Sequence, residues 1–300
     1  MSALAIDLGG TKLSLAVFTP EGEVIAKQTK NLDGRKGSEV GKLITDSITQ
    51  ITTQHPVKSV GVAVPGISRA EKGTVWAPNI EGWEDYPLLE EIRINSKRKK
   101  VKIDSDRACC ILGETWKGNA KDCKDAIFLA VGTGIGAGIM VDGKIIRGAN
   151  DIAGAIGWMA LDQPYQSKYK QCGSFEYNAS GEGLTRVAKE FSGDKFESAY
   201  DIFEAYEADD ADAKRVIDHA IVYWGMAIAN LVSLFNPQKI ILGGGVFGPA
   251  VKFISAIREE ATKWAQPISM QLVQIESSRL GPDAGLYGAA YLALQNSTFH

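Results

Sequence analysis

The sequence has few cysteines, and those present do not form a regular framework. Of the 300 residues only four are cysteine, at Cys109, Cys110, Cys123 and Cys172. Disulfide-stabilised domains are small and space their cysteines through the chain, whereas the adjacent pair fits a buried helix face. We therefore expect all four thiols to be reduced.

Long apolar runs, an N-terminal signal and an excess of positive charge are missing as well. No apolar run reaches the roughly 20 residues that span a bilayer, and no basic segment precedes the apolar residues at the N-terminus. The net charge is −3, and the basic cluster Lys97–Lys100 is expected to be a solvated loop before a strand. These absences favour a cytoplasmic protein that binds neither membranes nor nucleic acid.

The residues present are those of a globular protein, with 45% hydrophobic and 23% charged side chains. Apolar runs at 4–6, 13–18 and 24–30 predict three strands, a helical spacing of apolar residues follows at 40–51, and 60–64 predicts a fourth strand. The same β-β-β-α-β order returns with strands at 126–131, 138–141 and 144–147, a helix over 217–235 and a strand at 240–242.

This internal repeat predicts an α/β fold with two similar lobes and a ligand-binding cleft between them. The first lobe is expected to cover residues 1–117 and the second residues 118–285. A final helix within 286–300 is expected to pack back on the first lobe.

Glycine-rich turns follow equivalent strands of the two repeats. Asp7-Leu8-Gly9-Gly10-Thr11-Lys12 brings backbone N–H groups, a hydroxyl and a carboxylate together, as a phosphate site with Mg²⁺ held by Asp7 requires. A plain Gly-Gly hairpin explains that motif alone equally well. The second turn, with Gly132, Thr133, Gly134 and Gly136, makes phosphate binding the better explanation for both. A third, Gly243-Gly244-Gly245, offers adenosine a surface free of side chains.

Asp106 opens an expected helix directly after the short strand 101–104. An aspartate there is often a simple helix cap. Beside two phosphate turns, a carboxylate is also what phosphoryl transfer needs, because it orients the attacking hydroxyl and accepts its proton.

Together these motifs resemble the ROK family (repressors, open reading frames and kinases), whose kinase members are hexokinase-like enzymes of the ribonuclease-H/actin fold. The resemblance covers nearly the whole chain. It implies a sugar kinase that uses ATP and Mg²⁺, forms a homodimer and has Asp106 as catalytic base. It also implies sugar-binding roles for Pro65, Gly66, Asn79, Ser105, Asp106 and Glu176.

The sequence departs from the family at two segments. The family's Gly-Glu-x-Gly-His is replaced by Gly154-Ala155-Ile156-Gly157-Trp158, and its zinc-binding cysteines by Ser167, Tyr169 and Ser174. Zinc needs four nitrogen or sulfur ligands, so we expect no structural zinc. Trp158 is expected either to pack where zinc would order the loop, the preferred alternative, or to contact substrate.

The predicted reaction is transfer of the γ-phosphoryl group of Mg·ATP to a hydroxyl of a hexose or N-acetylhexosamine, N-acylmannosamine included. Two other functions stay open. One is a non-catalytic sugar sensor or regulator, although such family members carry a DNA-binding segment ahead of the first phosphate turn, which here begins at Asp7. The other is an actin-like ATPase.

Overall fold

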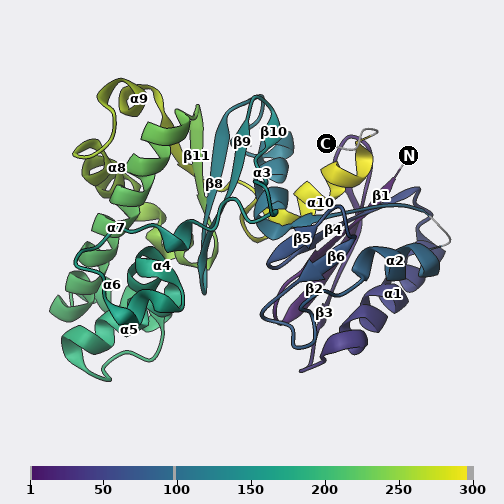
Figure 1. Ribbon diagram of the computed structural model, residues 1–300, viewed down its shortest axis with the longest axis horizontal. Helices are drawn as coiled ribbons and strands as arrows, with labels where there is room; N and C mark the ends of the chain where they lie inside the picture. The colour runs from purple at the N-terminus through teal and green to yellow at the C-terminus, as the bar shows by residue number, and fades with distance from the viewer. Residues whose placement is uncertain (1, 97–98, 296–300) are drawn as a thin grey trace. The chain divides into compact units, whose positions relative to one another are not determined.

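The computed structural model describes residues 2–96 and 99–295 (Figure 1). Two residues of the basic cluster, Lys97 and Arg98, and the end of the expected last helix, 296–300, lie outside the described residues. The chain forms two compact units. The first consists of Met1–Asp122, Ile145–Ala153 and Pro282–His300, and the second of Cys123–Lys144 and Gly154–Gly281. The expected second lobe, 118–285, thus includes a segment, Ile145–Ala153, that the structure groups with the first unit.

The first unit is built on a five-stranded sheet with the order β3-β2-β1-β4-β7. The strands β1 to β3 form an antiparallel meander, and β4 and β7 extend the sheet parallel to β1. A separate hairpin pairs β5 with β6. The bounds are β1 (Ala3–Leu8), β2 (Lys12–Phe18), β3 (Val24–Asn31), β4 (Ser59–Val64), β5 (Ile67–Arg69), β6 (Thr74–Trp76) and β7 (Lys100–Ser105).

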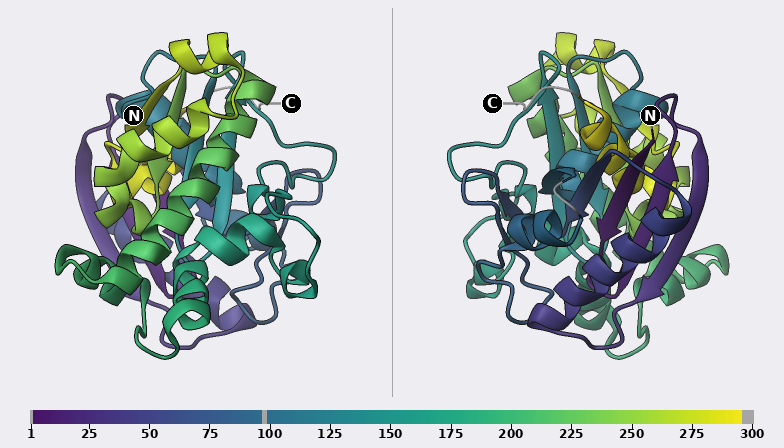
Figure 2. Two further views of the ribbon diagram at one scale, coloured as in Figure 1. Left: turned by 90° about the vertical axis from the view of Figure 1, so that its left-hand side faces the viewer. Right: turned by 90° about the vertical axis from the view of Figure 1, so that its right-hand side faces the viewer.

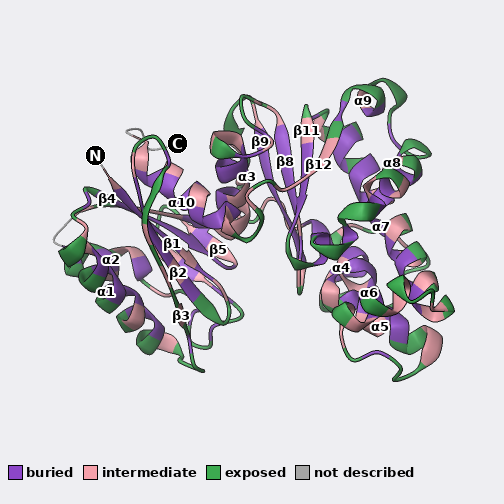
Figure 3. Ribbon diagram, turned by 180° about the vertical axis from the view of Figure 1, so that it is seen from behind, coloured by how far each residue is buried: buried purple, intermediate pink, exposed green. Residues whose placement is uncertain are grey.

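Within the described part of this unit the helices are α1 (Gly37–Gln54), α2 (Leu88–Asn95), α3 (Asp106–Lys117) and α10 (Ala284–Leu294). The apolar spacing read from the sequence is the buried face of α1, where Val40, Ile44, Ile48 and Ile51 join the core. β4 is buried along its whole length, as the purple strand in Figure 3 shows.

Glycines let α10 approach its neighbours at backbone distance. A Cβ on Gly288 would lie 1.7 Å from the carbonyl oxygen of Cys109 in α3, and one on Gly61 of β4 would lie 1.9 Å from the carbonyl oxygen of Ala289. Contacts that short are impossible for a real side chain, so these positions require glycine. The helix α10 is therefore fitted closely to α3 and β4.

The second unit repeats the arrangement of the first, with the sheet order β10-β9-β8-β11-β12. The strands β8 and β9 are antiparallel, and β11 and β12 extend the sheet parallel to β8. The predicted duplication and α/β class are confirmed. The bounds are β8 (Ala126–Val131), β9 (Ile135–Val141), β10 (Lys144–Ile145), β11 (Lys239–Gly243) and β12 (Gln274–Ser277).

Helices of the second unit enclose a large core around α7 (Ala211–Phe235). Figure 2 (left) shows α7 in green beside α8. By length and composition α7 is the one helix of the described residues that could cross a membrane, but its apolar side chains form the core. The other helices are α4 (Gly173–Ala179), α5 (Gly181–Ser192), α6 (Ala199–Glu207), α8 (Ile254–Thr262) and α9 (Pro267–Leu272), with 3₁₀ turns η1 (Ile156–Trp158), η2 (Ser167–Lys170), η3 (Gly245–Phe247) and η4 (Pro249–Phe253). The turn η5 (Gly281–Asp283) begins at the last residue of the second unit and leads along the chain into α10 of the first.

Candidate active site

The first glycine turn joins β1 to β2. The Gly9 N–H donates to the carbonyl oxygen of Lys12 at 2.8 Å, which closes the turn, and Gly10, Thr11 and Lys12 are exposed. A Cβ on Gly10 would lie 3.4 Å from the Cβ of Asn79. The turn and Asn79 border one hollow of about 340 Å³, which residues 32–36 and Glu81 complete. The structure thus brings the predicted phosphate turn and the predicted sugar ligand Asn79 together.

Asp7, at the end of β1, is surrounded by negative charge. Burial, and then the carboxylates of Asp106 and Asp283, raise the pKa of Asp7 to about 7. The start of α10 covers it, since a Cβ on Gly285 would be 2.9 Å from Asp7 Oδ2. Mg²⁺ is commonly held by one or two carboxylates together with substrate phosphates, so the Asp7 carboxylate fits the predicted magnesium site, although the described residues form no group of three metal ligands around it.

Asp283 and Gly285 were not anticipated as site residues. Asp283 lies at the start of α10, where both carboxylate oxygens accept from Lys27 Nζ at 2.7 Å. In the sequence, the run Gly281-Pro-Asp-Ala-Gly ahead of apolar residues indicates the start of a helix and nothing more. Only the folded chain shows that this helix start covers Asp7.

Asp106 is the first residue of α3. Its Oδ1 accepts from the backbone N–H of Arg107 at 2.7 Å. Among the described residues no side chain donates to its other oxygen, Oδ2. Burial raises its pKa although the Arg107 charge opposes this, and 45% of the side chain is still exposed. Asp106 therefore has a free oxygen and a raised proton affinity, as a general base requires. The helix cap is Ser105, whose Oγ accepts from the Ala108 N–H at 3.3 Å.

Pro65 and Gly66 link β4 to β5. Pro65 is buried at the start of this link. Gly66 has φ +98, and a Cβ there would be 2.3 Å from the carbonyl oxygen of Trp76. The Gly66 carbonyl accepts from Arg107 Nη2 at 3.2 Å. This link thus fixes the arginine that follows Asp106.

In the second unit three segments meet around the turn between β8 and β9. The Gly132 N–H donates to the carbonyl of Gly134 at 2.9 Å, and the Gly132 carbonyl accepts from the Gly181 N–H at 2.7 Å. Gly244, with φ +88, lies so close to β8 that a Cβ would be 2.3 Å from the carbonyl oxygen of Val131. Thr133 is exposed beside them, and no atom lies within 4 Å of a Cβ placed on Gly245.

Two of the glycines expected to bind nucleotide, Gly136 and Gly243, are packed against other residues of the second unit. Gly136 is inside β9, paired with Ala130, so it belongs to the sheet and not to the turn. Gly243 ends β11, where a Cβ would be 2.2 Å from the Phe128 ring. The surface open to a ligand is therefore made by Gly132 to Gly134 together with Gly244 and Gly245.

Glu176 of α4 is turned toward the second glycine turn. Its Oε2 accepts from the Ile135 N–H at 2.7 Å, and a Cβ on Gly134 would lie 2.7 Å from the same oxygen. Burial raises the pKa of this carboxyl, while the Ile135 hydrogen bond opposes the shift. The predicted sugar ligand thus also supports the predicted phosphate turn.

A family model, described as ROK family, matches residues 3–296, which include both sets of residues. The chain belongs to the ROK family. The predicted resemblance is confirmed.

Known ROK proteins of two kinds match over nearly the whole chain. A glucokinase of Halalkalibacterium halodurans is 33% identical over 97% of this chain and 94% of its own. A xylose repressor of Caldicellulosiruptor bescii is 28% identical over 98% of this chain and 78% of its own. The crystal structure of a Streptomyces griseus ROK glucokinase in complex with glucose and AMPPNP matches with a TM-score of 0.80 and 26% sequence identity. The match covers 98% of this chain and 99% of the glucokinase chain. The actin-like fold prediction is thereby confirmed.

The zinc segment of this ROK protein is held by hydroxyl groups. Ser174, at a cysteine position of the family pattern, accepts from the Leu161 N–H and donates to the Met159 carbonyl, both at 2.9 Å. Tyr169, at another, is buried, hydrogen-bonds Asp162 and packs edge-on against Tyr177. Ser167 starts the short turn η2. Within the described ranges no group of three or more His, Cys, Asp or Glu side chains could hold a metal ion, and these hydroxyl donors do not fit zinc.

Trp158 does not pack in place of zinc. Its side chain is 58% exposed at the end of η1, which contradicts the preferred expectation. The physical reason is that Tyr169 and Ser174 already connect the two parts of the loop. A Cβ on Gly173 would lie 2.4 Å from the Cα of Trp158, so the backbones are in contact and leave the indole on the surface.

Proposed function

We propose that this ROK protein transfers the γ-phosphoryl group of ATP to a hydroxyl of a hexose or N-acetylhexosamine. The enzyme class, a sugar kinase, is supported by family membership and by relatives named glucokinase. The observation that carries the proposal is Asp106, a carboxylate with one uncommitted oxygen in the same unit as the exposed turn at Gly10.

In the proposed reaction the sugar hydroxyl oxygen forms a bond to the γ-phosphorus while the bond from that phosphorus to the β,γ-bridging oxygen breaks. Asp106 Oδ2 accepts the hydroxyl proton, and ADP is the leaving group. The raised pKa of Asp106 favours this proton transfer, because it increases the affinity of the carboxylate for the proton.

Phosphate binding is assigned to the exposed backbone of both turns, with Thr11, Lys12 and Thr133 adding polar groups. Asp7 would hold Mg²⁺, which supplies positive charge against the phosphates. A cation there would also offset the repulsion that Asp106 and Asp283 exert on the Asp7 carboxylate.

The sugar is proposed to contact Asn79, Asp106, Glu176 and the exposed Trp158. The family glutamate at position 155 is an alanine, which removes a hydrogen-bonding group for an ordinary hexose hydroxyl and costs about 1–3 kcal/mol. Acceptors that carry an N-acyl group are therefore included with glucose and other hexoses. A homodimer and a cytoplasmic location stay predictions from the family resemblance.

The test measures ADP release with Mg·ATP and a panel of hexoses and N-acetylhexosamines. We expect one sugar to stimulate release strongly and Asp106→Asn to reduce kcat at least a hundredfold. The exposed Asp46→Asn is the matched control and should leave kcat unchanged. Full activity of Asp106→Asn would refute the catalytic role.

A sugar sensor is the second candidate, because a repressor is among the relatives. It predicts sugar binding without phosphorylation of any sugar in the panel. The third candidate, an actin-like ATPase, predicts ADP release that no sugar stimulates.

A further inference from the structure

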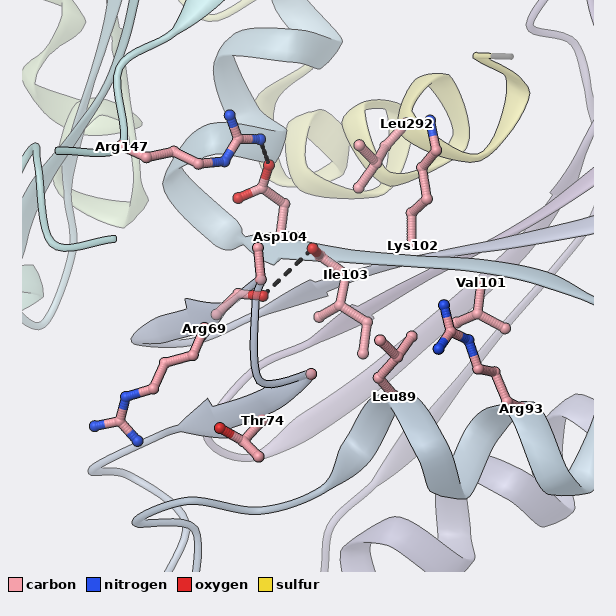
Figure 4. Close-up of a pocket in the computed structure, with 13 residues that line it drawn as sticks. Arg69, Thr74, Leu89, Arg93, Val101, Lys102, Ile103, Asp104, Arg147 and Leu292 are labelled. Carbon is pink, nitrogen blue, oxygen red and sulfur yellow. Dashed lines mark hydrogen bonds and ion pairs between the residues drawn. The ribbon is translucent and has the colours of Figure 1, made fainter. Parts of the chain in front are cut away.

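A second hollow of the first unit lies at the exposed edge strand β7 and contains none of the proposed active-site residues. Its volume is about 170 Å³, whereas about 10–15 Å³ suffices for one water. Figure 4 shows aliphatic side chains from three elements, α2, β7 and α10, on the two sides of β7. These side chains are Leu89, Val101, Ile103 and Leu292.

Arginines stand at opposite ends of this hollow in Figure 4, Arg147 at one end and Arg93 at the other. Arg147 uses one nitrogen, Nη2, to pair with Asp104, and its other N–H groups have no partner among the described residues. Arg93 is exposed on α2 and makes no hydrogen bond or ion pair within 2–96 and 99–295. Both guanidinium groups thus have N–H donors to offer an anion.

The other cations at the rim are already engaged. Arg69 pairs with Asp85 at 2.5 Å and points away from the hollow. Lys102 donates from Nζ to the carbonyl oxygen of Gln295 at 3.1 Å. The cationic N–H groups that remain for a ligand are therefore those of Arg93 and Arg147.

We propose that this hollow binds a small linear dicarboxylate, with one carboxylate on Arg93, the other on Arg147 and the aliphatic body along the edge of β7 among these apolar side chains. Guanidinium pairs well with carboxylate and with phosphate. Asp104 beside Arg147 favours the carboxylate, because it carries one negative charge and a phosphate carries more.

The bound anion acts on α3 through Asp104. The Ser105 N–H donates to Asp104 Oδ1 at 2.9 Å, and Ser105 caps the helix that begins with Asp106. A ligand that shares Arg147 weakens the pair with Asp104, which is buried and depends on that cation. Occupancy is therefore expected to lower kcat, a consequence that rests on the proposed function.

The binding test is calorimetric titration of the full chain, without ATP or sugar, with dicarboxylates from succinate to sebacate. Each is compared with the monocarboxylate of equal length. We expect one length to bind best, at least tenfold more tightly than its monocarboxylate. Arg93→Gln should weaken that dicarboxylate about tenfold and leave the monocarboxylate nearly unchanged. The control Lys42→Gln, an exposed cation on α1, should change neither.

Equal binding of mono- and dicarboxylates, or no effect of Arg93→Gln, would overturn the site whether or not the protein is a kinase. Inorganic phosphate that binds as tightly as the best dicarboxylate would also overturn it. If the site binds as expected, the same dicarboxylate should reduce kcat in the wild type and in Lys42→Gln but not in Arg93→Gln. An unchanged kcat would refute the connection to α3.

Discussion

Asp7 is a nearly buried carboxyl group beside two other carboxylates, and this environment makes stability depend on pH. Its pKa is raised from 3.8 to about 7. Between these values the folded protein retains a proton that the unfolded chain has lost. The stabilising contribution of the protonated group is therefore complete below about pH 4 and disappears as the pH rises through 7.

We predict that metal-free wild-type protein loses stability over this range relative to Asp7→Asn. The difference between their free energies of unfolding, measured by urea denaturation, should fall by about 1.4 kcal/mol per pH unit between pH 4.5 and 6.5. A difference that is flat or rises with pH would show that Asp7 is ionised in the folded, metal-free protein.

Glu176 is predicted to affect ATP as well as sugar. Glu176→Ala leaves the Ile135 N–H without its acceptor and removes the support of the turn at Gly134. An unsatisfied buried group costs about 1–3 kcal/mol, so the KM for ATP should rise at least fivefold. The control is Glu182→Ala, because Glu182 pairs with Arg186 on the surface. A change confined to the KM for sugar would limit Glu176 to the sugar.

At the scale of elements, the packing of α10 against α3 leaves no room for a side chain at Gly288. Gly288→Ala places a Cβ against the carbonyl of Cys109 at a distance that forces the helices apart. We predict a loss of stability of about 3 kcal/mol or more in urea denaturation. The control Gly248→Ala meets nothing closer than 3.4 Å and should cost less than about 1 kcal/mol. Similar losses in both variants would contradict this packing.

The elements that the sequence predicted well are those with local signals. Strand alternation, the apolar face of α1 and the turns at Gly10 and Gly132 depend on neighbours within a few residues, so the sheet strands and the repeat could be predicted. The cover that α10 places over Asp7 joins residues about 280 positions apart, and no local pattern records such a contact.

The expected packing of Trp158 was wrong, because the loss of a metal ligand can be compensated in more than one way. Replacing a zinc ligand by Trp158 suggested packing, because tryptophan is usually buried. In the structure the Ser174 hydroxyl holds the loop together instead, because its oxygen hydrogen-bonds the Leu161 N–H and the Met159 carbonyl. Which residue compensates for a lost ligand is decided by the geometry of the folded loop.

At the scale of the molecule, the chain passes between the two units several times, and the first unit needs its C-terminal segment. We predict that a fragment of residues 1–122 does not fold alone, because it exposes the surfaces of β4 and α3 on which α10 packs. Circular dichroism and limited proteolysis should show an unfolded, rapidly cleaved chain. A fragment that joins residues 282–300 to 1–122 by a short linker should recover cooperative unfolding, and cooperative unfolding of 1–122 itself would contradict the prediction.

The return of α10 to the first unit also sets an order for synthesis on the ribosome. Residues 1–122 emerge before the second unit, yet the helix that completes their core, α10, emerges after it. The second unit can therefore finish folding earlier than the first, although it is translated later. Until α10 has emerged, the nascent first unit presents apolar surface, and during that interval this surface is exposed to chaperones and proteases.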